Sequence, residues 1–198
     1  MADLPSRDDS VLVRNGAKPA DTGPVPLRPD NLTQFRLARL ALLLDLAPQL
    51  PNGKPLDVER LGYYDFFAAN PFLIVKDEDP LRRELVLAGF DSRNLSYQSS
   101  AQRFTSRRAR LQHDLALLVA YGLVHAHADQ RRVVYALTDA GGELTGALRS
   151  LYARAYRRSV DIIVRRLNRL SDKALRESAQ DWLAAEGLLI DLYDVQTA

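Results

Sequence analysis

The sequence predicts a mainly α-helical protein: a winged helix-turn-helix with a short β-hairpin wing and a C-terminal helical extension. The first observation is the stretch Leu115–Gly142, LALLVAYGLVHAHADQRRVVYALTDAGG, which has the pattern of a helix end, a basic hairpin and a new helix start. The second is that no proline follows residue 80, which suits long helices. An apolar fraction of 46% is enough for a core.

Composition divides the chain into three parts. Residues 1–30 hold five of the ten prolines and few large apolar groups, which predicts a disordered N-terminal arm. We expect residues 31–142 to form the winged-helix domain. Residues 143–198 are expected to be C-terminal helices for dimer or partner contact.

Three helices are expected before the long one at the centre of the domain. The first is Leu32–Leu46, whose leucines form a broad apolar face. The second begins at Asp57, a good N-cap, with Leu56 and Leu61 placed as a hydrophobic staple. A short helix, Pro80–Phe90, precedes a polar connector.

Apolar periodicity predicts a long helix over Ser100–Tyr121, which Gly122 ends. Two short alternating segments, Leu123–Ala128 and Arg132–Leu137, predict the hairpin.

After the hairpin, we expect a single helix that is capped by Thr138 and runs to Leu170. A last helix should start at Ser171 and be broken by Gly187.

Charge is strongly segregated along the chain. Residues 93–169 hold 14 Arg and 5 acids, a net charge of +9, whereas residues 1–92 carry −3 and residues 170–198 carry −4. A block this basic attracts polyanions. A GC-rich genome could explain the excess of arginine over lysine, 23 to 4. The acidic tail could neutralise the block within the chain or in a partner copy.

Six arginines are the candidate DNA-binding residues. The N-terminal part of a recognition helix meets bases and phosphates, and a wing tip reaches phosphates. The positions are Arg103, Arg107, Arg108 and Arg110 in the long helix and Arg131 and Arg132 at the hairpin. The alternatives are a solvated helix face, pairing with the acidic tail, and a wing that serves only as packing scaffold.

No enzymatic site is expected. His125 and His127 share one face of a predicted strand, but no third zinc ligand is evident, so we expect neither a metal nor a cofactor. The sequence has no phosphate-binding loop, no nucleophile elbow and no H-E-x-x-H motif. It has no cysteine, no apolar run near eighteen residues and no secretion signal, which predicts a cytoplasmic protein that does not cross a membrane.

Two resemblances add a biological context. The segment from Gly122-Leu123-Val124 to Leu137-Thr138-Asp139-Ala140-Gly141 resembles the wing of MarR-type winged helices. The order of segments over roughly Asn31–Trp182 resembles the middle component of ABC-three-component systems, the group that includes Lamassu-type defence. The matching segments are the Leu-rich first helix, Leu56-Asp57…Arg60-Leu61…Asp65, Ser106…Arg110…Asp114-Leu115-Ala116-Leu117-Leu118…Gly122-Leu123-Val124, Tyr135-Ala136-Leu137-Thr138, Leu148…Ser150…Tyr152-Ala153 and Leu170-Ser171-Asp172…Leu175-Arg176.

This resemblance implies a small winged-helix subunit beside an SMC- or Rad50-like ATPase and an effector, in immunity against phage or plasmids. We therefore expect a non-catalytic accessory subunit that contacts double-stranded DNA and the ATPase. Its expected partner-binding residues are Leu151, Tyr152, Ile162, Ile163, Trp182, Leu188 and Leu189. The alternative is a stand-alone MarR-like transcription regulator, a homodimer that binds half-sites about one helical turn apart.

Overall fold

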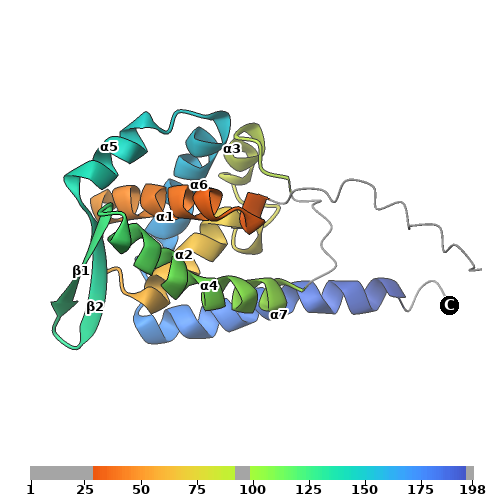
Figure 1. Ribbon diagram of the computed structural model, residues 1–198. Coiled ribbons are helices and arrows are strands. Elements are labelled where there is room, and N and C mark those ends of the chain that lie inside the picture. The colour runs from red at the N-terminus through yellow and green to blue at the C-terminus, as the bar shows by residue number, and fades with distance from the viewer. Residues whose placement is uncertain (1–28, 92–98, 195–198) are drawn as a thin grey trace, which may run out of the picture.

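The computed structural model describes residues 29–91 and 99–194, with side chains placed up to Ala185. The predicted arm, residues 1–30, therefore lies almost wholly outside the described residues. The described part consists of helices and one two-stranded antiparallel sheet (Figure 1). The prediction of a mainly helical protein is therefore confirmed. None of its helices combines the length and the apolar character that a membrane crossing needs.

Three helices form the centre of the core: α1 (Thr33–Leu46), α2 (Val58–Ala69) and α6 (Leu151–Leu167). In Figure 1, α1 crosses the middle of the molecule and α6 passes behind it. Their fully buried side chains include Leu40, Leu43, Tyr64, Phe67, Tyr156, Val160 and Ile163. Each contributes roughly 1.5–3 kcal/mol through burial, so these helices stabilise the frame that carries the surface elements.

Side-chain caps start the helices where the sequence predicts them. Asp57 accepts the N–H of Arg60 at 2.8 Å and begins α2. Ser99 and Gln102 form a capping box that begins α4 (Ser100–Ala120). Thr138 accepts the N–H of Gly141 and begins α5 (Asp139–Ala147).

The predicted hairpin is present as β1 (Val124–Asp129) and β2 (Arg132–Leu137), paired from Val124–Leu137 to Asp129–Arg132. Gly122 has a φ of 68°, a left-handed conformation that ends α4 and turns the chain into β1. A bridge between Asp57 and Val134, with the hydrogen bond from Tyr135 N to Leu56 O (3.1 Å), attaches β2 to the residues before α2.

The single helix expected from Thr138 to Leu170 is wrong. The chain leaves the helical conformation at Leu148, whose ψ is 90°, and Ser150 caps a separate helix, α6. Arg157 fixes the corner because its guanidinium donates to the carbonyls of Leu148 (2.8 Å) and Thr145 (2.6 Å). This long-side-chain contact satisfies carbonyls that a continuous helix would have bonded internally.

The remaining elements are short turns and a long last helix. The expected break at Gly187 is wrong, because the backbone of α7 (Asp172–Asp194) stays helical through it. The predicted helix Pro80–Phe90 is reduced to α3 (Arg82–Leu87), which Gly89 ends with a φ of 103°. Three 3-10 turns complete the description: η1 (Pro29–Asn31), η2 (Ala47–Gln49) and η3 (Pro71–Leu73).

Candidate nucleic-acid interface

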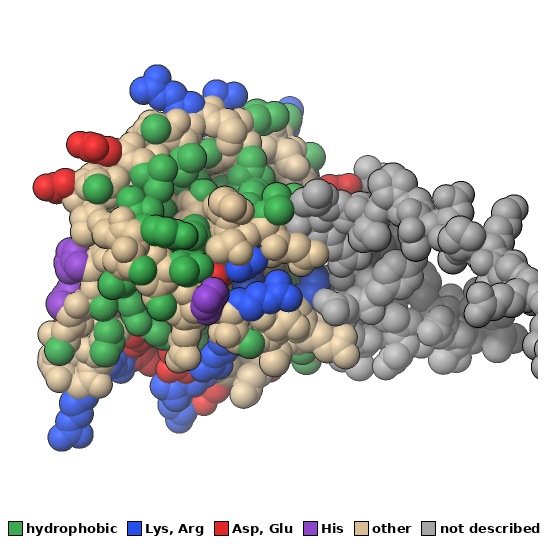
Figure 2. Space-filling view, in the orientation of Figure 1, with side chains coloured by type: hydrophobic (Ala, Val, Ile, Leu, Met, Phe, Trp, Pro, Cys, Tyr) green, Lys and Arg blue, Asp and Glu red, His purple; other side chains and the backbone are tan. Residues whose placement is uncertain are grey.

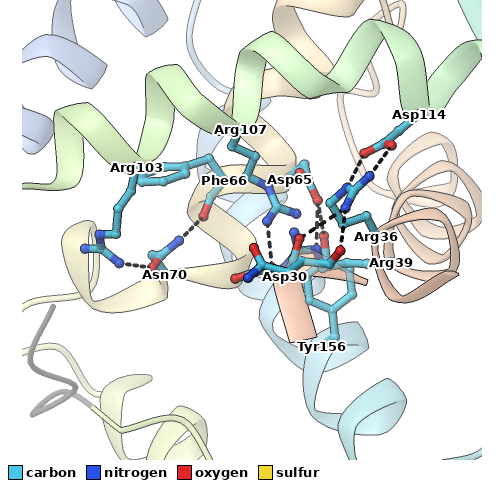
Figure 3. Close-up of polar contacts among 11 residues, drawn as sticks. Asp30, Arg36, Arg39, Asp65, Phe66, Asn70, Arg103, Arg107, Asp114 and Tyr156 are labelled. Atoms are coloured by element: carbon cyan, nitrogen blue, oxygen red, sulfur yellow. Dashed lines mark hydrogen bonds and ion pairs between the residues drawn. The ribbon is translucent and has the colours of Figure 1, made fainter. Parts of the chain in front are cut away.

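Arg107, expected to contact DNA, lies in a network of charged side chains between α4, α1 and α2 (Figure 3). Its Nε pairs with Asp65, and its Nη1 lies 3.0 Å from Asp30 Oδ1. Only 15% of the Arg107 side chain is exposed. Arg107 therefore holds α4 against the body of the protein.

The same network continues into the core. Arg39, 2% exposed, places its Nε 3.2 Å from Asp65 Oδ1 and donates from Nη1 to Asp30 Oδ1 at 2.9 Å. The hydroxyl of Tyr156 donates to Asp65 at 3.3 Å. Burial raises the pKa of Asp65 to about 6, although the Arg39 guanidinium and the Tyr156 hydroxyl act in the opposite direction.

A second buried pair lies nearby. Arg36 makes a two-pronged contact with Asp114 of α4, through Nε to Oδ2 (2.7 Å) and Nη2 to Oδ1 (2.9 Å). Both side chains are almost fully buried. The fork geometry makes this a directional bond between α1 and α4.

Arg103 lies at the start of α4 and is half-buried. It donates to Asn70 Oδ1 at 2.9 Å (Figure 3) and to Ser100 Oγ at 3.0 Å. Asn70 itself donates to Phe66 O at 2.9 Å at the end of α2. Arg103 therefore connects the start of α4 to the end of α2.

Arg132, beside the turn at the tip of the hairpin, is also paired. Its Nη1 lies 3.0 Å from Asp57 Oδ2 and its Nη2 lies 2.7 Å from Asp172 Oδ2. Arg60, which is 3% exposed, holds the other oxygen of Asp172. The Arg60 and Arg132 guanidinium groups lower the pKa of Asp172 to about 2.

Arg108, Arg110 and Arg131 are exposed, and none of them has an ion pair within the described part of the chain, whereas Arg132 is exposed but paired. Figure 2 shows Lys and Arg side chains at the tip of the hairpin and on the surface of α4. Of the six predicted DNA-binding arginines, these three are both exposed and without an ion pair in the described residues. The structure engages Arg103, Arg107 and Arg132 in contacts with the chain's own residues.

The histidines stay unassigned. The rings of His125 and His127 stack with centroids 5.5 Å apart on the exposed face of β1. In the described ranges, no group of three or more metal-ligating side chains comes together.

The acidic partners of these arginines are the residues that the sequence analysis missed. Asp57 was predicted only as a helix cap, and Asp65 and Asp172 were named only within the segments that resemble the family. One sequence signal could have indicated these acids. Asp57 and Asp172 lie at helix N-termini, where the helix dipole favours a carboxylate.

A family model for the ABC-three component (ABC-3C) system Middle Component 2 matches residues 81–185, just over half of the chain. The chain belongs to this family. The prediction of an ABC-three-component middle component is therefore confirmed, whereas the Lamassu type and the MarR-like wing stay predictions. No curated protein and no solved structure matches the chain.

Membership in the Middle Component 2 family indicates an accessory subunit of a defence system and implies partnership with the other components. Two of the residues predicted to bind partners are exposed: Leu151 at 72% and Tyr152 at 39%. Tyr152 and Trp182 line one open cavity of about 530 Å³. Its other aromatic walls are Phe35, Phe72 and Phe90.

The remaining predicted partner residues are placed differently. Ile162 and Ile163 are 3% and 0% exposed in the core of the Middle Component 2 chain, so they stabilise its own fold instead of being open to a partner. Trp182 packs edge-on against Phe67 with ring centroids 5.3 Å apart, so part of its surface serves the fold. The side chains of Leu188 and Leu189 lie outside the described residues.

Proposed function

We propose that the chain is a non-catalytic winged-helix accessory subunit of a bacterial defence complex, and that it contacts double-stranded DNA and an SMC- or Rad50-like ATPase. The order of elements supports the winged helix: α1, an extended residue, α2, α4 and then the hairpin. The extended residue is Asp57, whose bridge to Val134 supplies the third strand of such a wing. The segment with α3 is an insertion between the second and third helices.

The observation that carries the DNA contact is the open face of α4 beside the hairpin. Polar or small side chains are exposed along it at Gln102, Thr105, Ser106, Ala109, Gln112, His113 and Ala116. Since successive helical residues turn by about 100°, Arg108 and Arg110 flank this face on opposite sides of Ala109. A helix with arginines on both flanks suits a major groove about 12 Å wide, because each flank meets one phosphate backbone.

Salt dependence tests this contact. If Arg108, Arg110 and Arg131 each neutralise one phosphate, the slope of log affinity against log salt is about −2.7. Raising the salt from about 50 to 200 mM then weakens binding by roughly 40-fold, which fluorescence anisotropy with a labelled 30-base-pair duplex can measure. An unchanged affinity over this range would contradict the proposal.

A matched pair of triple variants locates the contact. Changing all three open arginines to Gln should remove most of the affinity and flatten the salt slope. The control changes Arg83, Arg149 and Arg154, which are exposed on α3 and at the α5–α6 corner, away from the hairpin (Figure 1). Both variants lose the same charge, so an equal loss in the control would indicate non-specific attraction.

The protein contact is proposed at Leu151, Tyr152 and the aromatic cavity beside Trp182. Large exposed apolar and aromatic side chains are typical of interface centres. Leu151→Asp should abolish co-purification with the ATPase while leaving the thermal unfolding temperature unchanged, because the side chain is 72% exposed. Retained co-purification would move the partner surface elsewhere on the chain.

The stand-alone MarR-like regulator is the second candidate, favoured by the polar face of α4, which can contact base edges. A regulator purified alone is a stable dimer that protects one palindromic operator. An accessory subunit co-purifies from its operon with a large ATPase and an effector. Mass analysis of the tagged chain expressed with its genomic neighbours separates the two.

A further inference from the structure

Four charged side chains join the hairpin to the starts of α2 and α7. We name them the wing clasp: Arg132 on β2, Asp57 before α2, Asp172 at the start of α7, and Arg60 in α2. Arg132 bridges Asp57 Oδ2 at 3.0 Å and Asp172 Oδ2 at 2.7 Å. The clasp therefore fixes the orientation of the Arg132 guanidinium at the tip of the wing.

The clasp is asymmetric, because its members differ in exposure. Arg60 is 3% exposed and also donates to Tyr64 Oη at 2.8 Å, so it is fixed in the core. Arg132 is 49% exposed. When Arg132 leaves, Asp172 keeps its bond to Arg60, and Asp57 keeps its capping bond to the N–H of Arg60 at 2.8 Å. Arg132 can therefore exchange its partners while each carboxylate keeps a hydrogen bond.

Carboxylate and phosphate oxygens compete for the same guanidinium fork, because both accept two N–H bonds from it. We propose that the wing clasp restrains DNA binding: Asp57 and Asp172 occupy Arg132 until a DNA phosphate displaces them. This inference rests on the DNA contact proposed above. Arg132 thereby becomes a fourth DNA contact beside the three open arginines, and it is available only when Asp57 and Asp172 release it.

The clasp also couples the two proposed surfaces. Asp172 is the first residue of α7, and this helix carries Trp182 on the proposed partner side. A protein partner that displaces the first turn of α7 withdraws a carboxylate from Arg132. Such a partner therefore strengthens DNA binding through the wing without touching DNA.

Asp172→Asn in the full chain tests the clasp. Exposed ion pairs contribute about 0.2–1 kcal/mol, so removing one of the two carboxylates that hold Arg132 should tighten binding to the 30-base-pair duplex by roughly 1.4- to 5-fold at low salt. The control is Asp139→Asn, an exposed acid two residues beyond β2 with no ion pair in the described residues. It removes the same charge near the wing without freeing a guanidinium, so it should tighten binding less.

A double-mutant cycle with Arg132→Gln identifies the route. In the Arg132→Gln background, Asp172→Asn should raise the affinity no more than Asp139→Asn does. The clasp is refuted if Asp172→Asn never exceeds the control, or if its gain persists without Arg132. If circular dichroism shows folded chains and none of them binds the duplex, the proposed DNA contact fails as well. Binding with no clasp effect refutes this inference alone.

Discussion

Gly141, in the first turn of α5, is the position where a single added methyl group should do the most damage at the hairpin root. A Cβ built on Gly141 would lie 2.1 Å from Leu123 O and 2.8 Å from Leu137 Cδ2, against an ordinary contact of 3.4–4 Å. The overlap with a backbone oxygen exceeds 1 Å, so no side-chain rotation relieves it. That oxygen also accepts the N–H of Thr138 at 3.1 Å, a bond that closes the hairpin.

We therefore expect Gly141→Ala to lower the free energy of unfolding by about 3 kcal/mol, the upper end of the range for an overpacked core. The control is Gly142→Ala, next in the same helix, where an added Cβ meets nothing within 4 Å. This variant should gain up to about 1 kcal/mol, because alanine favours a helix over glycine. Urea denaturation followed by far-UV circular dichroism measures both. Equal stability of the two variants would refute the packing argument.

Two further predictions concern ion pairs. Asp172→Asn should lower the free energy of unfolding by about 1 kcal/mol at pH 7. The lowered pKa of Asp172, about 2, corresponds to at most about 2.4 kcal/mol. Solvent screening reduces that figure because the carboxylate is 34% exposed. Since the folded pKa lies below the unfolded value, this stability is present above about pH 4 and lost as the pH falls towards 2, so urea denaturation should show the two proteins converging there. Asp114→Ala should cost about 3–5 kcal/mol in thermal and urea unfolding, because it strands the buried Arg36. The double variant Arg36→Met/Asp114→Leu should recover most of that loss, and failure to recover would mean that the pair is not the cause.

The elements that the sequence predicted best are those with local signals. The cap at Asp57, the glycine at Gly122 and the alternation in β2 each act within a few residues, and all are confirmed. The corner between α5 and α6 was missed because it contains neither proline nor glycine. Its cap, Ser150, is a weak signal, and the contact that fixes it comes from Arg157, seven residues later.

The ion pairs could not be predicted, because their partners lie far apart in the sequence. Arg107 and Asp65 are 42 residues apart, and Arg36 and Asp114 are 78 apart. No local pattern links such positions; only the packing of α4 against α1 and α2 does. The charge count of the basic block was correct, but the surface it forms depends on these distant acids.

The preference for arginine has a physical use in this chain, which holds 23 Arg and only 4 Lys. Arg36, Arg39 and Arg60 are 8%, 2% and 3% exposed, and each is paired with a carboxylate. A guanidinium can bridge two acceptors from a fixed plane and is less strongly hydrated than an ammonium, so it tolerates burial where lysine would not. A high arginine content therefore reflects buried ion pairs within the fold as well as affinity for polyanions. The DNA contact must be sought where the guanidinium stays exposed, at Arg108, Arg110 and Arg131, and at Arg132 once its carboxylates release it.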